Sequence, residues 1–222
     1  MKSKRPQALK YQYQTLELSE TVVHLRTLRD NQQFSDPEGV AETLGVPPAG
    51  WSHFGLLWDS SKVLARLMQG FDVTGCRVLE VGCGVGLSSL ILSGRHSDIT
   101  ATDHHPDAQQ HLQWNVELNN LRSIPFFRTG WDDGPSALGR FDLIIGSDLL
   151  YQPDHPALLS TFIEDHARSA CQVILVDPRR GYMNQFGRLM LGHGFDETPI
   201  EGSPYSLEDE TPGCRIGSYQ RS

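Results

Sequence analysis

The sequence predicts an α/β fold: a Rossmann-like, doubly wound and mostly parallel seven-stranded sheet with helices on both faces and an N-terminal extension. Three observations support this fold class. Short β-rich runs alternate with helical patterns from residue 77 onward, which is the order that βαβ units produce. Two of these runs, Phe141–Ile145 and Gln172–Val176, are largely apolar, as expected for strands that are buried on both faces. A glycine-rich turn also separates the first run from the first helical pattern that follows it.

The segment before residue 77 is less regular. Alternating residues between Leu16 and Arg29 predict a strand, which fits half of a hairpin. Proline and glycine are frequent between residues 37 and 50 and predict a long irregular link. Apolar residues at helical spacing from Ser60 to Met68 then predict a helix that ends near Gly70. We therefore expect residues 1–70 to form an extension and residues 71–222 to form the main domain.

The main domain shows a repeated order of strand and helix. We expect strands at Arg77–Val81, Asp98–Thr102, Ile124–Phe127, Phe141–Ile145 and Gln172–Val176, with a final candidate at Cys214–Tyr219. We expect helices at Leu87–Leu92, Pro106–Asn119, Ala157–His166 and Met183–Leu191. Pro106 suits the first turn of its helix. Proline has no backbone N–H, and an N–H in the first turn would have no intrahelical partner.

Composition narrows the functional classes. No apolar run in the 222 residues reaches the roughly 18–20 residues that a membrane span needs, and polar sequence follows the basic residues Met1–Pro6, so we expect neither a membrane helix nor a signal peptide. A net charge of −8 disfavours a protein that grips nucleic-acid phosphates. The four cysteines contain no C-x-x-C pair, which favours structural thiols in a cytoplasmic chain without a metal site. Nothing in the sequence sets the oligomeric state, and a monomer is the default.

The turn Gly82-Cys83-Gly84-Val85-Gly86 is the most informative segment. Glycines at a strand–helix turn let a ligand approach the backbone at a helix N-terminus. The dinucleotide fingerprint requires its third glycine at position 87, where this chain has leucine. Glu80 precedes the turn and would repel a pyrophosphate, so its carboxylate favours a cationic ligand instead. Asp103 ends the second strand, where a carboxylate can accept hydrogen bonds from both hydroxyl groups of a ribose.

The E-x-G-x-G-x-G pattern from Glu80 to Gly86, together with Asp103, resembles the first motif of the class I S-adenosylmethionine-dependent methyltransferases. Two further segments resemble the family 16 (METTL21-like) lysine methyltransferases. Ser147-Asp148-Leu149-Leu150-Tyr151 is similar to their D-x-x-Y element, and Gly55–Ser61 is similar to their tryptophan-containing segment. The resemblance spans roughly residues 20 to 195 and is weakest at the C-terminal end.

The resemblance implies a transferase that moves a methyl group from S-adenosyl-L-methionine to an amine, most simply a lysine side chain of a protein, and releases S-adenosyl-L-homocysteine. It implies that the extension covers the acceptor site. Asp148 and Tyr151 would line that acceptor site. The residues placed near the cofactor are Trp58, Glu80, Gly82, Cys83, Gly84, Gly86, Asp103, His104, Trp131, Asp132 and Ser147. In this interpretation Trp131 stacks on the adenine and Asp132 accepts from its amino group.

Several alternatives stay open at the level of sequence. A small-molecule N- or O-methyltransferase uses the same scaffold, and a chain that binds the cofactor without turnover would act as a partner-binding module. Glu80 and Leu87 argue against a nicotinamide oxidoreductase. The absence of an N/D-P-P-Y motif after the fourth strand argues against adenine bases of nucleic acids and against glutamine as acceptors.

Asp148 could orient an acceptor amine, but a carboxylate raises the pKa of a lysine, so burial or proton loss to water must supply the neutral amine. Structural explanations of the same residues also remain. Asp148 could cap the following helix, and Tyr151 could pack on that helix. Arg179 and Arg180 follow the fifth strand, where they could meet an acidic patch of a substrate or simply form a surface loop.

Overall fold

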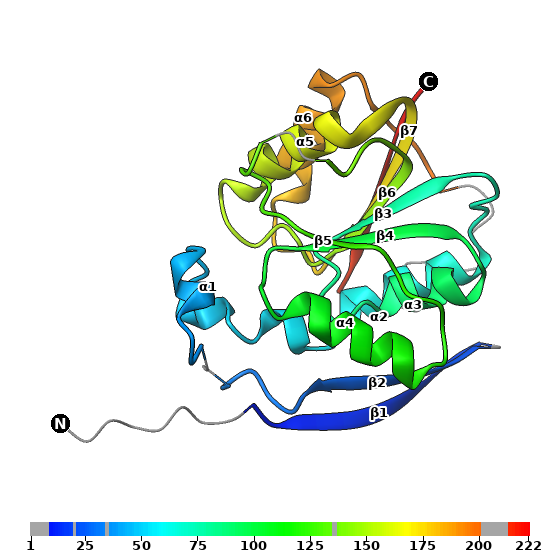
Figure 1. The fold of residues 1–222 in the computed structure, drawn as a ribbon. Coiled ribbons are helices and arrows are strands. Elements are labelled where there is room, and N and C mark those ends of the chain that lie inside the picture. Colours follow the sequence, from blue (N-terminus) through cyan, green and yellow to red (C-terminus); the bar gives the residue numbers. More distant parts are fainter. Residues whose placement is uncertain (1–8, 20, 34–35, 135–136, 201–212) are drawn as a thin grey trace.

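The structure is a computed structural model that describes residues 9–19, 21–33, 36–134, 137–200 and 213–222 (Figure 1). The basic residues Met1–Pro6 lie outside the described residues. Within the described ranges, no helix is both long and apolar enough to cross a membrane. The four cysteines all fall inside these ranges and are free thiols.

A seven-stranded sheet forms the centre of the described chain, in the order β5-β4-β3-β6-β7-β9-β8. Its strands are β3 (Arg77–Val81), β4 (Asp98–Asp103), β5 (Phe126–Arg128), β6 (Phe141–Ser147), β7 (Ala167–Asp177), β8 (Asp196–Glu197) and β9 (Arg215–Arg221). The strands from β5 to β7 pair in parallel, and β9 pairs antiparallel with both β7 and β8. The mostly parallel sheet predicted from the sequence is therefore confirmed.

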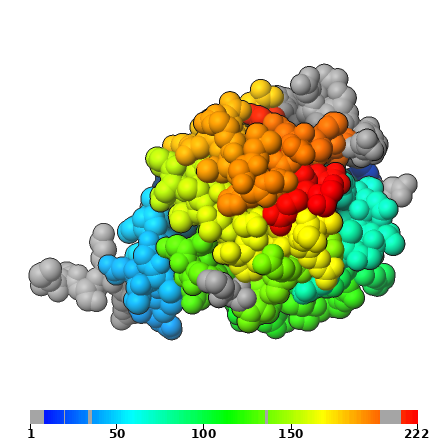
Figure 2. Space-filling view, turned by 90° about the horizontal axis from the view of Figure 1, so that it is seen from above, coloured from blue at the N-terminus to red at the C-terminus, as the bar shows by residue number. Residues whose placement is uncertain are grey.

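Helices cover both faces of this sheet (Figure 1). The helices are α2 (Asp59–Gly70), α3 (Leu87–Gly94), α4 (Ala108–Leu118), α5 (His155–His166) and α6 (Met183–Gly192). Helices α2, α3 and α4 lie on one face, and α5 and α6 lie on the other. Seen from above, α5, α6 and the red β9 strand form much of the near surface, and the blue segment of residues near 40–50 forms one edge (Figure 2).

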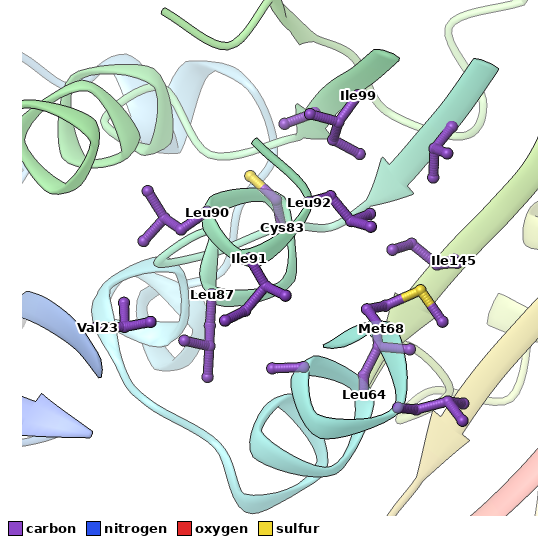
Figure 3. Packing of buried hydrophobic residues seen from close by; sticks show 14 of the residues in the cluster. Val23, Leu64, Met68, Cys83, Leu87, Leu90, Ile91, Leu92, Ile99 and Ile145 are labelled. Atoms are coloured by element: carbon purple, nitrogen blue, oxygen red, sulfur yellow. The ribbon is translucent and has the colours of Figure 1, made fainter. Parts of the chain in front are cut away.

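Two apolar clusters, one on each side of the sheet, hold these layers together. Successive strand residues point to opposite faces, so Ile144 joins the cluster under α5 and α6 while Ile145 joins the cluster under α2 and α3. On the second side, Leu64 and Met68 of α2 meet Leu87 of α3 (Figure 3). All five side chains are at most 1% exposed, and each such burial stabilises the fold by roughly 1.5–3 kcal/mol.

The first elements of the described chain form an antiparallel hairpin, β1 (Tyr11–Leu18) and β2 (Thr21–Leu28). The hairpin packs on α4 (Figure 1). The side-chain oxygen of Asn115 accepts a hydrogen bond from the backbone N–H of Arg26 at 2.7 Å, and the Arg26 guanidinium lies 3.8 Å from the ring centroid of Trp114. The span from Leu16 to Arg29, predicted as one strand that fits half of a hairpin, instead contains the end of β1 and the whole of β2.

The link that follows is more ordered than the prediction of an irregular segment. It contains α1 (Val40–Thr43) and two 3₁₀ turns, η1 (Pro48–Gly50) and η2 (His53–Gly55). Proline at the start of η1 has a backbone torsion that suits a helical turn. Phe54 fixes the segment to the domain, because its buried ring stacks on His105 with 4.0 Å between ring centroids.

Two other elements differ from their predicted bounds. The strand expected at Ile124–Phe127 begins instead at Phe126, because Pro125 has no N–H to donate to a neighbouring strand. Helix α4 begins at Ala108, two residues after Pro106. The short strand β8 has two residues, too few to leave a pattern in the sequence.

Candidate active site

A cavity of about 560 Å³ lies at the carboxyl ends of β3, β4, β6 and β7. Its volume is within the range of about 300–1,000 Å³ that small-ligand sites occupy. Residues from the loops after β3, β4, β5, β6 and β7 line it, and the segment of residues 45–58 lines it from the side of the extension. A crevice at the carboxyl ends of the strands is where open α/β sheets bind ligands.

The glycine turn after β3 forms one wall of this cavity. Gly82, Gly84 and Gly86 have φ angles of 60°, 52° and 78°, in the left-handed region that glycine enters without steric cost. Gly82, Cys83 and Gly84 line the cavity, whereas Gly86 is the N-cap of α3 and does not. A Cβ atom at Gly84 would lie 3.2 Å from the carbonyl oxygen of Phe54, so this turn also packs closely against the extension.

Asp103 faces the same cavity from the end of β4. Its Oδ2 accepts a hydrogen bond from the backbone N–H of Gly84 at 2.9 Å, and its Oδ1 accepts from the backbone N–H of His105 at 2.9 Å. Burial raises the pKa of the Asp103 carboxyl, and the two backbone donors partly oppose that shift. Each oxygen retains acceptor capacity, so the carboxylate can still bind hydroxyl groups of a ligand.

His104 presents an acceptor atom next to Asp103, at the end of the cavity formed by β3 and β4. Its Nε2 lies 3.1 Å from the carbonyl oxygen of Leu44, which can only accept, so Nε2 carries the proton in the neutral ring. The opposite atom, Nδ1, is buried and has no hydrogen-bond partner among the described residues. A buried acceptor without a partner is costly, and a ligand donor would remove that cost.

Trp131 and Asp132 complete the part of the cavity beyond β5. Trp131 is half-buried, and its ring meets His155 edge to face with 5.1 Å between centroids. Asp132 lines the cavity and is exposed. The next residue, Asp133, holds the turn, because its Oδ2 accepts from the backbone N–H of Gly130 at 2.6 Å. The carboxylate that holds this turn is therefore that of Asp133 and not that of Asp132.

Glu80, which the sequence predicts near the cofactor, lies behind the glycine turn rather than in the cavity lining. The structure buries Glu80 beneath the start of α3 and outside the cavity lining. Its Oε2 accepts hydrogen bonds from the backbone N–H of Ser89, at 2.9 Å, and from the Ser89 hydroxyl. Burial raises the pKa of the Glu80 carboxyl to about 7, although the Ser89 donors oppose this shift. In this position Glu80 fixes α3 behind the glycine turn, and its contact with a cationic ligand stays a prediction.

The loop after β6 forms the opposite end of the cavity, where Ser147, Asp148 and Tyr151 all line it. Asp148 has a φ of 60°, which is uncommon for a residue other than glycine, and its backbone N–H donates to Val176 at 2.9 Å. This conformation directs the Asp148 carboxylate to Arg180, with which it forms an ion pair. The N-cap of α5 is Asp154, so Asp148 does not cap that helix.

A row of aromatic side chains connects this loop to the extension. His53 meets Trp58 and Tyr151 edge to face, with 5.6 Å and 5.9 Å between ring centroids. Tyr151 in turn meets His155 at 4.3 Å. Burial and the charge of Arg180 lower the pKa of His53, and burial together with Asp103 raises the pKa of Tyr151. These four rings form a largely apolar wall, in which Tyr151 and His53 are favoured in their neutral forms.

Sequence reasoning missed two of these wall residues, His53 and His155. His53 lies five residues before Trp58, and His155 lies four residues after Tyr151 at the start of α5. The available signal was their position close to Trp58 and Tyr151 in the sequence, because neighbouring residues of a loop often line the same site. Within the described ranges, no three His, Cys, Asp or Glu side chains are grouped so as to hold a metal ion.

Comparison with known proteins gives relatives for both the sequence and the fold. The chain is 30% identical over 144 residues to protein N-lysine methyltransferase METTL21A of Danio rerio, a match that covers 60% of this chain and 65% of that protein. It is 29% identical over 171 residues to the electron transfer flavoprotein beta subunit lysine methyltransferase of Xenopus laevis, covering 74% of this chain and 65% of that protein. The matched region is thus just under two thirds of each relative's length.

The fold is similar to that of an RNA-modifying enzyme of known structure. The 16S rRNA N2 G1207 methyltransferase of T. Thermophilus, solved with AdoMet and guanosine, superposes with a TM-score of 0.64 at 15% identity, over 97% of this chain and 52% of that chain. At this identity the likeness concerns the fold alone. A sequence profile of the family described as lysine methyltransferase matches residues 50–188, which is more than half of the chain. The chain therefore belongs to the lysine methyltransferase family.

Proposed function

We propose that this chain transfers a methyl group from S-adenosyl-L-methionine to the ε-amine of a lysine in a protein substrate, releasing S-adenosyl-L-homocysteine. One observation carries the proposal: a single cavity joins the glycine turn and Asp103 to Asp148 and Tyr151. Membership of the lysine methyltransferase family supports the same reaction, as do the names of the relatives from Danio rerio and Xenopus laevis. A cofactor end and an acceptor end in one space are what a direct transfer needs.

The residues at the β3 and β4 end fit the cofactor. Asp103 offers a carboxylate to the ribose hydroxyl groups, and the glycine turn lets the ligand approach the backbone. The unpartnered Nδ1 of His104 gives a polar donor of the adenosine a place to bind. Trp131 supplies a ring for stacking on the base, and Asp132, Trp58 and Ser147 line the same space. When bound, S-adenosylmethionine supplies an electrophilic methyl group on a cationic sulfur.

The acceptor end has to hold an amine in line with that methyl group. Asp148 would orient the amine by accepting a hydrogen bond, and Tyr151 would form the wall beside it. A free lysine has a pKa of about 10.4, so most of it is protonated at neutral pH. The apolar wall of His53, Trp58, Tyr151 and His155 disfavours the charged form by desolvation, so the proton is lost to water at the cavity mouth.

We also propose that the N-terminal extension, residues 1–70, covers the acceptor site of a domain formed by residues 71–222. The segment of residues 45–58 already lines the cavity, and its Phe54 is held between the glycine turn and His105. Closing an active site in this way excludes water from the reacting groups.

The proposal is tested by binding and by transfer. Calorimetry with S-adenosylhomocysteine should give a micromolar dissociation constant for the wild-type chain. Incubation with methyl-labelled S-adenosylmethionine and a cell lysate should then place label in protein. Label that appears only in soluble metabolites would favour a small-molecule acceptor, and binding without any transfer would favour a non-catalytic module.

A further inference from the structure

The Asp148 carboxylate at the acceptor end already has a cationic partner. Arg180, from the loop after β7, forms an ion pair with Oδ1 of Asp148. The Ser60 hydroxyl of α2 lies 3.4 Å from Oδ2. The Asp148 side chain is 11% exposed and that of Arg180 is 34% exposed, so the carboxylate is the buried partner and the guanidinium still reaches solvent. An ammonium group that approaches Asp148 therefore has to replace Arg180 or share the carboxylate with it.

The backbone around Arg180 aims its side chain at this position. The backbone N–H of Arg180 donates to Oδ1 of the buried Asp177 at 3.0 Å. The preceding residue, Arg179, has a φ of 61°, and its Nε donates to the carbonyl oxygen of Cys214 at 3.2 Å. The two neighbouring arginines thus point to different partners. Only Arg180 enters the cavity lining, where its guanidinium lies 5.9 Å from the ring centroid of Tyr151.

Displacing Arg180 leaves a partly buried cation without a partner. Such a group costs more than an exposed one, because its lost hydrogen bonds are not fully replaced by water. Burial also lowers the pKa of Arg180, which has the same physical origin. A substrate that brings an anion to Arg180 at the moment its lysine reaches Asp148 avoids this cost. Complementary charge of this kind sets specificity between partners.

We propose that Arg180 is a specificity-determining residue that selects lysines flanked by an acidic side chain. The substrate ammonium takes the place of the guanidinium at Asp148, and the guanidinium pairs with an aspartate or glutamate next to the target lysine. This inference rests on the proposed lysine methylation. It goes further by naming the substrate class: a lysine with an acidic neighbour, rather than a lysine in a basic or neutral segment.

The test begins with the proteins that the wild-type chain methylates in a lysate, with the modified lysines located by mass spectrometry. The protein that carries the strongest site is then purified with its acidic neighbours intact and with those neighbours changed, Asp→Asn and Glu→Gln. Both forms are assayed with wild type, Arg180→Ala, Arg180→Lys and the control Arg179→Ala. Binding of S-adenosylhomocysteine to each variant reveals any that fails to fold.

The expected result is that the modified lysine has an acidic residue within three positions. Neutralising that residue should raise the KM of wild type at least tenfold while kcat changes less than twofold. In Arg180→Ala the two substrate forms should have equal KM values, because the charge pair is gone. Arg180→Lys should recover part of the preference for the acidic form, and Arg179→Ala should behave as wild type.

Two results would overturn the inference while the proposed function stands. One is methylation of lysines that have no acidic neighbour. The other is an equal effect of neutralisation in wild type and in Arg180→Ala, as expected if the displaced guanidinium moves to the unpartnered Oδ2 of Asp177 instead of to the substrate. If the wild-type chain methylates no lysine at all, the proposed function fails and this inference fails with it.

Discussion

The backbone N–H of Gly84 donates a hydrogen bond to Oδ2 of Asp103 over 2.9 Å, which joins the glycine turn after β3 to the acidic end of β4. The turn and the carboxylate are therefore one unit rather than two separate features. A ligand that binds the carboxylate also meets the backbone of the turn. The sequence places these two residues 19 positions apart, and the parallel pairing of β3 with β4 brings them together.

Asp103→Asn should weaken binding of S-adenosylhomocysteine at least tenfold, which is about 1.4 kcal/mol. The reason is that the amide replaces one charged acceptor with a donor toward the ribose, and hydrogen bonds to charged groups contribute about 1.5–3 kcal/mol. Calorimetry measures the change. Asp98→Asn is the matched control, because this exposed residue begins the same strand outside the cavity and should leave the affinity unchanged. Equal affinity in wild type and Asp103→Asn would remove Asp103 from the cofactor site.

Gly84→Ala should reduce both stability and cofactor affinity. At a φ of 52° an added Cβ costs about 1–2 kcal/mol in backbone conformation, and here it would also lie 3.2 Å from the carbonyl oxygen of Phe54. Gly75→Ala has the same backbone penalty at a φ of 74° but no atom within 4 Å of the new Cβ. Chemical denaturation of both variants separates the two effects. If Gly84→Ala is no less stable than Gly75→Ala, the turn does not pack against the extension as described.

Glu80→Gln should leave the affinity for S-adenosylhomocysteine within about threefold of wild type, because Glu80 lies behind the turn and not in the cavity. The variant should instead change the pH dependence of stability. The folded-state pKa of about 7 exceeds the ordinary value of 4.5, so the folded chain binds the extra proton and loses stability as the pH rises from 4.5 to 7. Glutamine has no such titration, and denaturation at pH 5 and pH 8 should show a smaller difference than in wild type. A tenfold loss of affinity would instead restore a direct role for Glu80.

His105→Phe should flatten the acid limb of the stability profile. Burial lowers the pKa of His105 from 6.5 to about 4, so the unfolded chain binds the extra proton between these values. Stability contributed by His105 is therefore complete above pH 6.5 and is lost as the pH falls to 4, by about 3 kcal/mol. Phenylalanine keeps the stacking on Phe54 without this titration. Denaturation at pH 4 and at pH 7 measures the difference, which should be smaller in His105→Phe than in wild type; an equal difference would contradict this account.

Most of the fold was predictable because its signals are local. The apolar run of β6 predicts a buried strand, and the helical spacing of α2 predicts a helix. Both elements form where the pattern indicates. The hairpin partner Tyr11–Leu18 was not predicted, although Tyr and Gln alternate at its start; only Leu18 of its residues is fully buried. Strand β5 begins later than predicted because Pro125 has no N–H to donate to a neighbouring strand. The β-propensity of the run does not include this constraint.

The candidate site was predictable in its ligand-facing loops and less so in its electrostatics. Asp103 and Asp148 follow strands whose carboxyl ends share one edge, so their nearness follows from the parallel order. The motif does not state which face of β3 its glutamate occupies. The Glu80 side chain lies on the face toward α3, where it accepts from Ser89 outside the cavity lining. The ion pair of Asp148 with Arg180 depends on two loops that are 32 residues apart in the sequence, and no local pattern reports such a pair.

The central claim is that this chain methylates lysine, and amino-acid analysis of labelled protein tests it most directly. Lysate protein is incubated with the chain and with methyl-labelled S-adenosylmethionine, hydrolysed completely, and separated by chromatography. The account predicts label in methylated lysine for wild type, and at least a hundredfold less label for Asp148→Ala, which should still bind S-adenosylhomocysteine. Label in another amino acid, no label in protein, or full transfer by Asp148→Ala would contradict the account.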